Sequence, residues 1–410
     1  MADKNQTEQK KNNQIHSEQT LNSGNLLDIF MTALKLGLTS FGGPVAHLGY
    51  FKGEYVDRKK WLDDKLYADI IALCQFLPGP ASSQVGISIG MMRGGILGGV
   101  LSWLGFTLPS VIVLVVFAML YLQMDLSDQA FIGSLKVVAV AVVLHAIMGM
   151  AKNLTPDKPR ILIALIAAGV MLIYPNVWVQ ILTILGGALV GLVFFQKRER
   201  TKIEIFTINI PKKVSYYALG SLGALLALMP LLANWINNIY ITLFDIFFRV
   251  GAIVFGGGHV VLPMIERELV PVGLISPDAF LAGYGMAQAV PGPLFTFASY
   301  LGAIIADVPG AIIATIAVFL PSFLLIIAAL PFLTTLRENH YFQSALMGVN
   351  ATVVGILIAA FYDPVLTSGI VTGSDFFLGL VLFILLIIWK LPAWSIVLIG
   401  VGLGYLLHFI

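Results

Sequence analysis

Apolar runs separated by short polar stretches make up most of the chain after residue 24. Most of these runs hold the roughly 20 residues that a helix needs to cross a bilayer. The pattern predicts about 13 hydrophobic helical segments: six, then one after a charged linker, then six more. The segments are expected at 26–51, 66–92, 95–123, 130–151, 160–174, 177–196, 214–236, 240–265, 278–305, 309–336, 342–362, 375–389 and 393–409.

Composition supports the same fold class. Of the 410 residues, 58% are hydrophobic and 11% are charged, and the mean hydropathy of +0.90 lies far above that of soluble domains. We therefore predict an all-α polytopic membrane protein whose main partner is the lipid bilayer. The net charge of +2 gives no reason to expect nucleic acid. Cys74 is the single cysteine and the six histidines lack ligand spacing, so no disulfide, metal or cofactor is expected.

Four motifs recur in the same order in the two halves of the chain, at a nearly constant offset. They are F-G-G at 41–43 and 255–257, the glutamates Glu54 and Glu268, Q-x-x-P-G-P at 75–80 and 288–293, and L-P-S at 108–110 and 320–322. A tandem duplication explains this order. The expected organisation is a disordered cytoplasmic tail at 1–24, a first repeat at 25–196, the charged linker with one extra transmembrane helix at 197–239, and a second repeat at 240–410.

The odd number of helices between the repeats would make the second repeat enter the membrane from the opposite face, so the repeats are predicted to be inverted. The F-G-G and P-G-P motifs interrupt apolar segments, since proline cannot continue a helix. Pro44, Pro80 and Pro293 suit the first position of a restarted helix. Such a half-helix presents unpaired amides and its positive dipole end to the interior, which favours an anion.

The distribution of lysine and arginine bears on how the broken segments lie. If every segment crossed the membrane, the basic loop at 52–65 would lie outside, against the positive-inside rule. If both broken segments of each repeat are re-entrant hairpins, this loop lies inside and, among loop charges, only Arg267 lies outside. The rule favours hairpins, with deeply kinked spanning helices as the alternative. The N-terminus is then expected in the cytoplasm and the C-terminus on the other side.

Two cations lie within predicted segments. Lys35 is about nine residues into its segment, or roughly 13 Å deep at 1.5 Å per residue, and Arg249 is its repeat partner. A charge at the centre of a membrane helix costs at least about 2.5 kcal/mol, so it usually faces a cavity or a partner. One interpretation makes both cations part of the field that holds an anionic substrate. The other pairs Asp28 with Lys35 and Asp245 with Arg249 as structural ion pairs.

The motif residues are the remaining candidates for a substrate site. Their glycines could admit a ligand to the backbone or only allow close helix packing, and their glutamines could bind an oxyanion or brace the break. Hydroxyls after the P-G-P turns, including Ser299, could donate to an anion or bond back to their own helix. His47 and His259 could carry a coupling proton or be satisfied polar residues. Besides Lys35 and Arg249, the candidates are Phe41, Gly42, Gly43, Pro44, Gln75, Pro78, Gly79, Pro80, Ser82, Ser83, Phe255, Gly256, Gly257, Gly258, His259, Gln288, Pro291, Gly292, Pro293 and Thr296.

The motifs resemble those of the chromate ion transporter (CHR) family, in its long form with two fused homologous domains. The resemblance rests on F-G-G-P with E-Y-V after it, Q-F-L-P-G-P, F-G-G-G-H, and Q-A-V-P-G-P with F-L-P-S downstream, and spans nearly the whole chain beyond the tail. It implies a bacterial plasma-membrane transporter that exports chromate and confers chromate resistance, with sulfate as the tetrahedral analogue. The first F-G-G precedes proline and the second precedes Gly258-His259, so the two half-sites need not be equivalent.

Residues and resemblance together predict a secondary transporter. A dianion is held among the restarted half-helices, with Lys35 and Arg249 offsetting its charge, and one repeat rocks against the other. An inside-negative potential favours expulsion by about 2.3 kcal/mol per charge per 100 mV. The alternative is an anion channel, or a transporter for sulfate or another inorganic anion. No enzyme is expected, because no spacing of nucleophile, base or metal ligands appears, and a homodimer is an open possibility.

Overall fold

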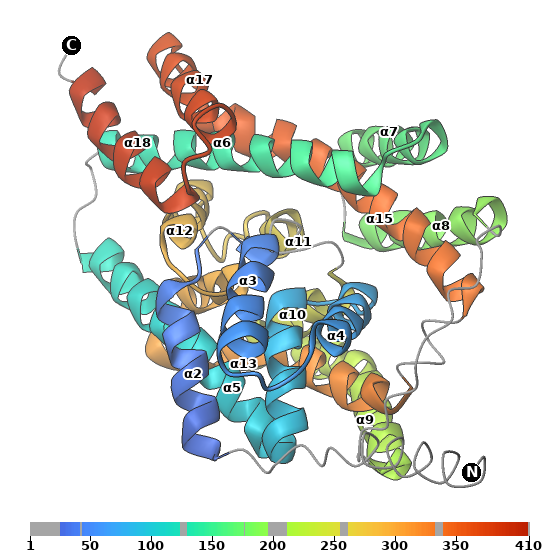
Figure 1. The fold of residues 1–410 in the computed structure, drawn as a ribbon. Coiled ribbons are helices and arrows are strands. Elements are labelled where there is room, and N and C mark those ends of the chain that lie inside the picture. The colour runs from blue at the N-terminus through green and yellow to red at the C-terminus, as the bar shows by residue number, and fades with distance from the viewer. Residues whose placement is uncertain are drawn as a thin grey trace, which may run out of the picture.

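The computed structural model describes residues 25–41, 43–123, 129–175, 177–195, 211–254, 261–332 and 339–408, and every regular element in these ranges is a helix. Figure 1 shows the first half of the chain in blue to green and the second half in yellow to red. The tail at 1–24 and most of the charged linker lie outside the described ranges. The predicted boundaries of the tail, linker and repeats therefore stay predictions.

The first half of the chain begins with short helices and not with full membrane spans. The side chain of Asn25 starts the first of them by accepting the N–H of Leu27. Asp63 likewise accepts the N–H of Leu66 and starts the helix before L-P-G-P. The helices are α2 (Leu26–Thr39), α3 (Gly43–Phe51) continued by the π-helix η1 (Lys52–Arg58), α4 (Asp64–Phe76), α5 (Ala81–Gln123), α6 (Gln129–Leu154), α7 (Lys158–Ile173) and α8 (Val177–Phe194).

The second half repeats this order after one intervening helix, α9 (Lys212–Trp235). Asn238 and Ser276 cap the helices that correspond to those capped by Asn25 and Asp63. The sequence-based expectation of one extra helix between two similar series agrees with this order. The elements are α10 (Ile239–Ile253), α11 (Val261–Leu269), α12 (Pro277–Ala289), η2 (Leu294–Thr296), α13 (Phe297–Ala329), η3 (Leu330–Phe332), α15 (His340–Ala360), η4 (Phe361–Leu366), α16 (Thr367–Gly369), α17 (Gly373–Ile387) and α18 (Ala393–His408).

The two longest helices, α5 and α13, are broken at the same place by the same backbone conformation. Gly95 has φ 63° and ψ −160°, and Asp307 has φ 53° and ψ −157°. In α5 the break turns the chain back on itself, since a Cβ added to Gly90 would lie 2.5 Å from the carbonyl oxygen of Gly98. The predicted separation of segments 66–92 and 95–123 is therefore correct, and the duplication is visible in the backbone itself.

The F-G-G segments fold back as hairpins. Lys35 on α2 forms an ion pair with Glu54, which follows α3, so these two helices run antiparallel on either side of residues 40–42. Arg249 on α10 forms an ion pair with Glu268 on α11 in the same way. A straight helix would place residues 19 positions apart almost 30 Å apart along its axis. The two limbs of each F-G-G segment therefore lie side by side, as the hairpin interpretation predicts.

The P-G-P segments also fold back. The Cys74 sulfur on α4 lies 3.7 Å from the hydroxyl of Ser88 on α5. In the second repeat, the Tyr300 hydroxyl on α13 donates to the carbonyl of Ala279 on α12 at 2.9 Å. In both cases the helix ends before the P-G-P turn and a new helix begins after it. The helix breaks predicted at these motifs are confirmed.

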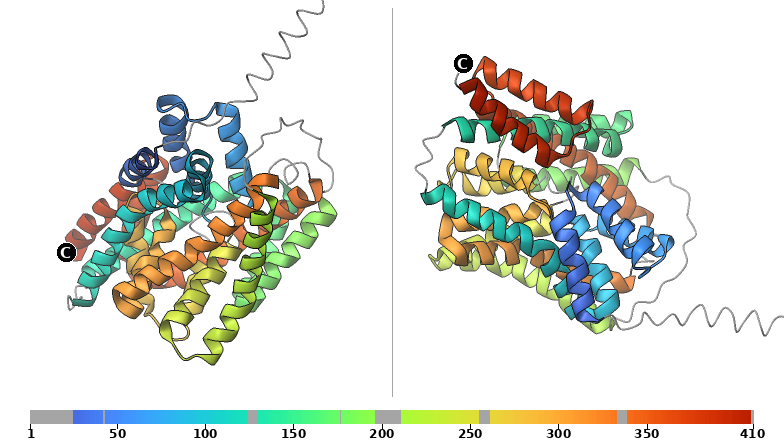
Figure 2. Two further views of the ribbon diagram at one scale, coloured as in Figure 1. Left: turned by 90° about the horizontal axis from the view of Figure 1, so that it is seen from below. Right: turned by 60° about the vertical axis from the view of Figure 1, so that its left-hand side comes forward.

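The later helices exchange partners between the two halves. In the first half, α6 packs against α17 and α18 of the second half, and α15 of the second half packs against α7 and α8 of the first. Figures 1 and 2 show both groups, with α6 beside the red helices at one side of the molecule. Such reciprocal packing of equivalent elements indicates a two-fold relation between the repeats.

Glycines allow the backbones of α8 and α15 to touch. A Cβ on Gly348 would lie 1.9 Å from the carbonyl oxygen of Gly187, and a Cβ on Gly191 would lie 2.3 Å from the carbonyl oxygen of Ser344. Close approach at small residues is the usual basis of helix packing in membranes. This contact holds the first half of the chain to the second.

We expect Gly348→Ala to destabilise the protein by about 1–3 kcal/mol, because the new methyl group would force the two backbones apart. Gly169→Ala is the matched control, since a Cβ at that helical position meets nothing within 4 Å. The control should be neutral or slightly stabilising, because alanine favours helix. Thermal unfolding of the purified variants in detergent measures both, and equal melting temperatures would contradict the packing interpretation.

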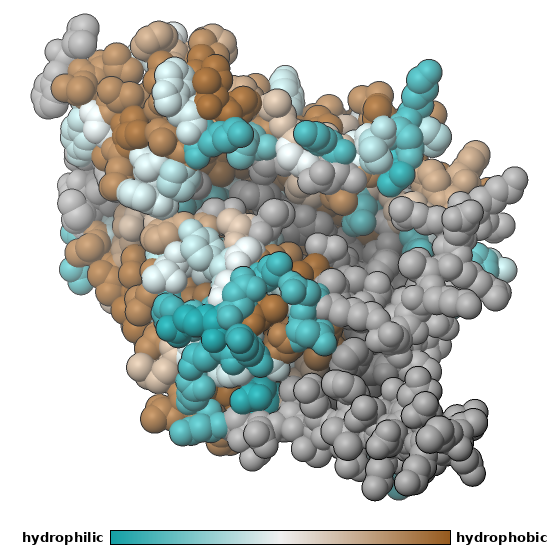
Figure 3. Space-filling model, in the orientation of Figure 1, coloured by the Kyte–Doolittle hydropathy of each residue, from teal (hydrophilic) through white to brown (hydrophobic). Residues whose placement is uncertain are grey.

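The outer surface is that of a membrane protein. Figure 3 shows mostly hydrophobic side chains, with hydrophilic ones gathered over the first helices. Within the described ranges, five helices are long and apolar enough to span a bilayer. The prediction of an all-α polytopic membrane protein is thus confirmed. The five are Ala81–Gln123, Gly133–Lys152, Lys212–Trp235, Leu294–Phe332 and Gln343–Asp363.

Candidate anion site

The tips of the hairpins from the two repeats meet inside the protein. The amide of Gly292, in the second P-G-P turn, donates to the carbonyl of Ser40 at 2.9 Å. The amide of Gly79, in the first P-G-P turn, donates to the carbonyl of Val254 at 2.6 Å. Ser40 and Val254 end equivalent helices, so each P-G-P turn binds the end of the other repeat's first helix. We call these contacts the Ser40–Gly292 junction and the Val254–Gly79 junction.

Both junction glycines are sterically required. Gly79 has φ +119° and Gly292 has φ +102°, conformations that side chains with a Cβ rarely adopt. An added Cβ would lie 2.7 Å from the Ser322 hydroxyl at Gly79, and 2.9 Å from the Ser110 hydroxyl at Gly292. Because both glycine amides already donate to carbonyls, they do not present free N–H groups to an anion. In this respect the expectation of unpaired amides at the breaks is wrong for these two residues.

Buried polar side chains gather beside the Ser40–Gly292 junction. His47 on α3 is 1% exposed, and its Nδ1 lies 3.2 Å from the hydroxyl of Ser82 in the first turn of α5. The ring packs edge-on against Phe106, whose carbonyl also faces Gly292. Within the described ranges, the His47 Nε2 and the hydroxyls of Ser40 and Ser83 have no hydrogen-bond partner. The first repeat therefore holds unsatisfied polar groups close to the restarted helix α5.

The Val254–Gly79 junction differs in its side chains. The positions that correspond to Ser40, His47 and Ser82 are Val254, Val261 and Phe295, all of which are buried. Among the described residues its polar side chains include Gln84, whose amide nitrogen donates to the carbonyl of Pro78 at 2.6 Å and lies 3.4 Å from the Ser322 hydroxyl. The two junctions therefore have the same backbone contacts but different side chains around them.

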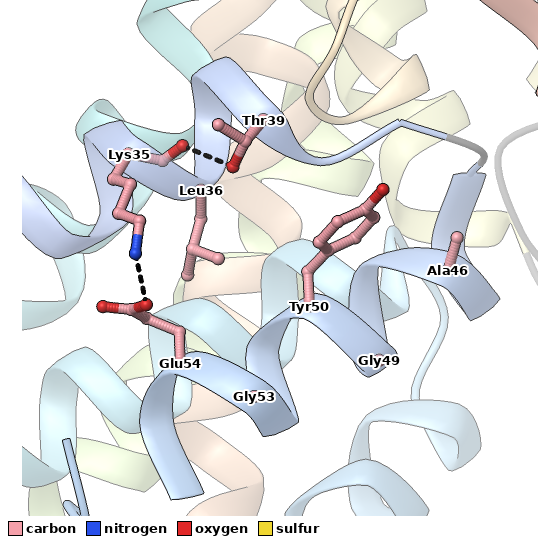
Figure 4. A pocket seen from close by; sticks show the side chains of 8 residues that line it. All are labelled: Lys35, Leu36, Thr39, Ala46, Gly49, Tyr50, Gly53 and Glu54. Carbon is pink, nitrogen blue, oxygen red and sulfur yellow. Dashed lines mark hydrogen bonds and ion pairs between the residues drawn. The ribbon is translucent and has the colours of Figure 1, made fainter. Parts of the chain in front are cut away.

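An open cleft of about 450 Å³ lies between α2 and α3 of the first repeat. Figure 4 shows Lys35 and Glu54 at one end and Tyr50 towards the other, with glycines along α3 leaving room between the helices. Thr39, one residue before Ser40, also lines the cleft. The cleft therefore extends from a cation towards the junction. Its lining residues are Lys35, Leu36, Thr39, Ala46, Gly49, Tyr50, Gly53 and Glu54.

Lys35 belongs to a cluster with excess positive charge. Its ammonium lies 2.7 Å from the Glu54 carboxylate, which also accepts from Arg58, so two cations share one carboxylate. The Lys35 side chain is 48% exposed and Glu54 is 6% exposed. The predicted pair with Asp28 is wrong, since Asp28 binds Lys59 at 2.6 Å. Lys35 keeps donor capacity towards the cleft because an ammonium has three donors.

The cluster around Arg249 has more negative than positive charges. Arg249 donates to Glu268 at 2.5 and 3.1 Å and to Asp245 at 3.0 Å, so one cation is shared by two carboxylates. The Arg249 side chain is 21% exposed. The predicted pair with Asp245 is correct. This cluster carries net negative charge, whereas the equivalent cluster around Lys35 carries net positive charge, so the two cations are not equivalent towards an anion.

The other predicted candidates have different surroundings. Several candidates lie outside what the structure describes. They are Gly42, the side chain of Gln75, and Phe255, Gly256, Gly257, Gly258 and His259 within residues 255–260. Thr296 and Ser299 bond back to the carbonyls of Pro293 and Thr296, so they donate within their own turn. Gln288 has a buried amide nitrogen with no partner among the described residues. Phe41 packs against Trp394, with 5.8 Å between the ring centroids. Gly43 and Pro44 are the first two residues of α3. The glycines of the P-G-P turns are flanked by Pro78, Pro80, Pro291 and Pro293.

Three residues with a place in the site were not singled out from the sequence. Ser110 and Ser322 face the P-G-P glycines of the opposite repeat, and Gln84 braces the first turn. The L-P-S motif marked both serines as repeated, and that repetition was the available signal. Their contacts depend on the docking of the repeats and have no local pattern.

The family model for the chromate transporter family matches residues 27–192 and 241–405. The chain belongs to the chromate transporter family. The two matched regions correspond to the two structural repeats, with α9 between them. Membership in this transporter family, together with the apolar helices, makes the chain a multi-pass membrane transporter.

Individual relatives in this family are similar over most of their length. The chain is 28% identical to a chromate transport protein of Pseudomonas aeruginosa over 82% of this chain and 80% of that protein. It is 29% identical to a probable chromate transport protein of Synechococcus elongatus over 80% and 81% of the two chains. An uncharacterised transporter of Methanocaldococcus jannaschii is 27% identical over 85% and 87%. No solved structure matches the chain.

Proposed function

We propose that the chain carries a tetrahedral oxyanion, chromate or its analogue sulfate, across the plasma membrane by alternating access. The observation that supports this most is the half-exposed Lys35 in a cleft that extends towards the meeting hairpin tips. A cluster with net positive charge beside a restarted helix attracts anions. The names of the relatives in Pseudomonas aeruginosa and Synechococcus elongatus favour chromate.

The two junctions suggest how the site changes its exposure. Each consists of one backbone hydrogen bond between the repeats, so the junctions themselves can break and re-form as one repeat rocks against the other. An inside-negative potential then favours export of the anion. The orientation with the N-terminus in the cytoplasm stays a prediction from the charge distribution.

The test is uptake of labelled chromate and of labelled sulfate into proteoliposomes under an imposed membrane potential. Saturable uptake that responds to the potential supports a transporter, whereas large currents without saturation would identify an anion channel. Absence of flux of either anion would overturn the proposal.

Lys35→Gln should lower the flux by about 10- to 100-fold, the loss expected when one charge-assisted contact of about 1.5–3 kcal/mol is removed. Lys52→Gln is the matched control, because Lys52 is 50% exposed and also binds one carboxylate, on Asp64, but does not line the cleft. The control should keep wild-type flux. Equal flux in the two variants would show that Lys35 is structural.

A further inference from the structure

His47 occupies a place that packing alone does not explain. It lies on the side of α3 that faces α5, and the neighbouring Ala46 lines the cleft. Its Nδ1 lies 3.2 Å from the hydroxyl of Ser82. The ring also lies close to the backbone of Ser40, whose carbonyl accepts the hydrogen bond of Gly292. The imidazole therefore touches the first-repeat side of the Ser40–Gly292 junction and the start of α5 together.

One ring nitrogen of His47 lacks a hydrogen-bond partner among the described residues. Nε2 is buried and has no partner in the described part of the chain. The elements packed against it contribute Ser40, Ser82 and Phe106, and no charged group among the described residues acts on it. The second repeat has Val261 at the equivalent position. Among the described residues, the equivalent position in the second repeat therefore holds no titratable group.

We propose that His47 binds a proton that travels with the anion, so that the protein is a proton–anion symporter. This inference rests on the proposed oxyanion transport and adds the coupling ion to it. An imidazolium buried without a carboxylate lacks charge compensation. A bound dianion supplies that compensation, and the imidazolium in turn attracts the dianion.

The sign of this interaction selects symport over exchange. Opposite charges bind cooperatively, and thermodynamic linkage makes the effect reciprocal: the anion strengthens proton binding as much as the proton strengthens anion binding. Exchange in opposite directions requires that each ligand exclude the other, whereas the attraction between opposite charges favours their binding together. A dianion with one proton still carries one negative charge, so the membrane potential continues to favour export.

The experiment uses the full-length protein in proteoliposomes with labelled sulfate outside and a pH-sensitive dye inside. For the wild type we expect an acid-outside pH gradient to drive sulfate accumulation that a protonophore abolishes, and we expect internal acidification to speed up when sulfate is added outside. For His47→Gln we expect pH-driven accumulation to fall by about tenfold or more, within the usual range of coupling between two ligands. Exchange of internal for external sulfate moves no net proton, so it should fall less in this variant than the pH-driven accumulation does.

His145→Gln is the control, because His145 is an exposed histidine on α6, a helix that contributes no residue to either junction. It should behave as the wild type in all three measurements. Wild-type sulfate flux without proton movement would overturn the symport inference while leaving oxyanion transport intact, whether or not His47→Gln folds. Undiminished pH-driven accumulation by His47→Gln would also overturn it. No sulfate or chromate flux in the wild type would instead overturn the proposed function.

Discussion

Arg249→Gln should unfold at a much lower temperature than the wild type, with a loss of about 3 kcal/mol or more in the free energy of unfolding. Arg249 is the shared partner of Asp245 and Glu268, whose side chains are 6% and 15% exposed. Removing the guanidinium leaves two carboxylates close together and away from water. Buried charges without partners are among the largest single causes of destabilisation. Thermal unfolding in detergent, followed by the loss of monodisperse protein, measures the effect.

Arg58→Gln is the matched control for this prediction. Arg58 also binds a buried carboxylate, but its side chain is 58% exposed and Glu54 keeps Lys35 as a partner. Its loss should therefore cost about 1 kcal/mol or less, as for an exposed ion pair. The double variant Arg249→Gln with Glu268→Gln should recover part of the stability, because one unpaired charge is removed. A double variant less stable than Arg249→Gln would contradict this account.

Sequence reasoning found both cations within the predicted segments but could not distinguish them. The pair of Arg249 with Asp245 was predictable because residues four apart on a helix are neighbours. The pairs of Lys35 with Glu54 and of Arg249 with Glu268 depend on reversal of the chain at the F-G-G breaks. The opposite net charge of the two clusters follows from those pairs, so it emerged only when the hairpins were seen.

The breaks and the duplication were predictable because they are local. Proline and glycine stop a helix wherever they stand, and repeated motifs reveal a repeat without any knowledge of its fold. The junction bonds of Gly79 and Gly292 were not predictable, since each joins residues from different repeats. The same limit explains why the amides at these turns were expected to be free. Their partners, Val254 and Ser40, carry no sequence signal for such a contact.

Gly79→Ala is expected to abolish most transport and to lower stability. The backbone at φ +119° would cost about 1–3 kcal/mol with an alanine. The new methyl group would also lie 2.6 Å from the Gln84 amide nitrogen and 2.7 Å from the Ser322 hydroxyl. Relief of these clashes moves the turn away from Val254 and breaks the junction. Sulfate flux in proteoliposomes and the melting temperature in detergent are the two measurements.

Gly273→Ala separates the effect of the junction from that of the backbone. Gly273 has φ +75°, also in the left-handed region, but a Cβ there meets nothing within 4 Å. This control should lose about 1 kcal/mol of stability and keep its transport.

Adding Ser322→Ala to Gly79→Ala removes one of the two clashing atoms and should restore part of the flux. If the two glycine variants lose flux equally, strain at the turn and not contact between the repeats would be the cause. If only Gly79→Ala loses flux and Ser322→Ala restores some of it, the two repeats act on each other through this junction. The reciprocal bond at Gly292 should then respond in the same way, because it joins the same elements with the repeats exchanged.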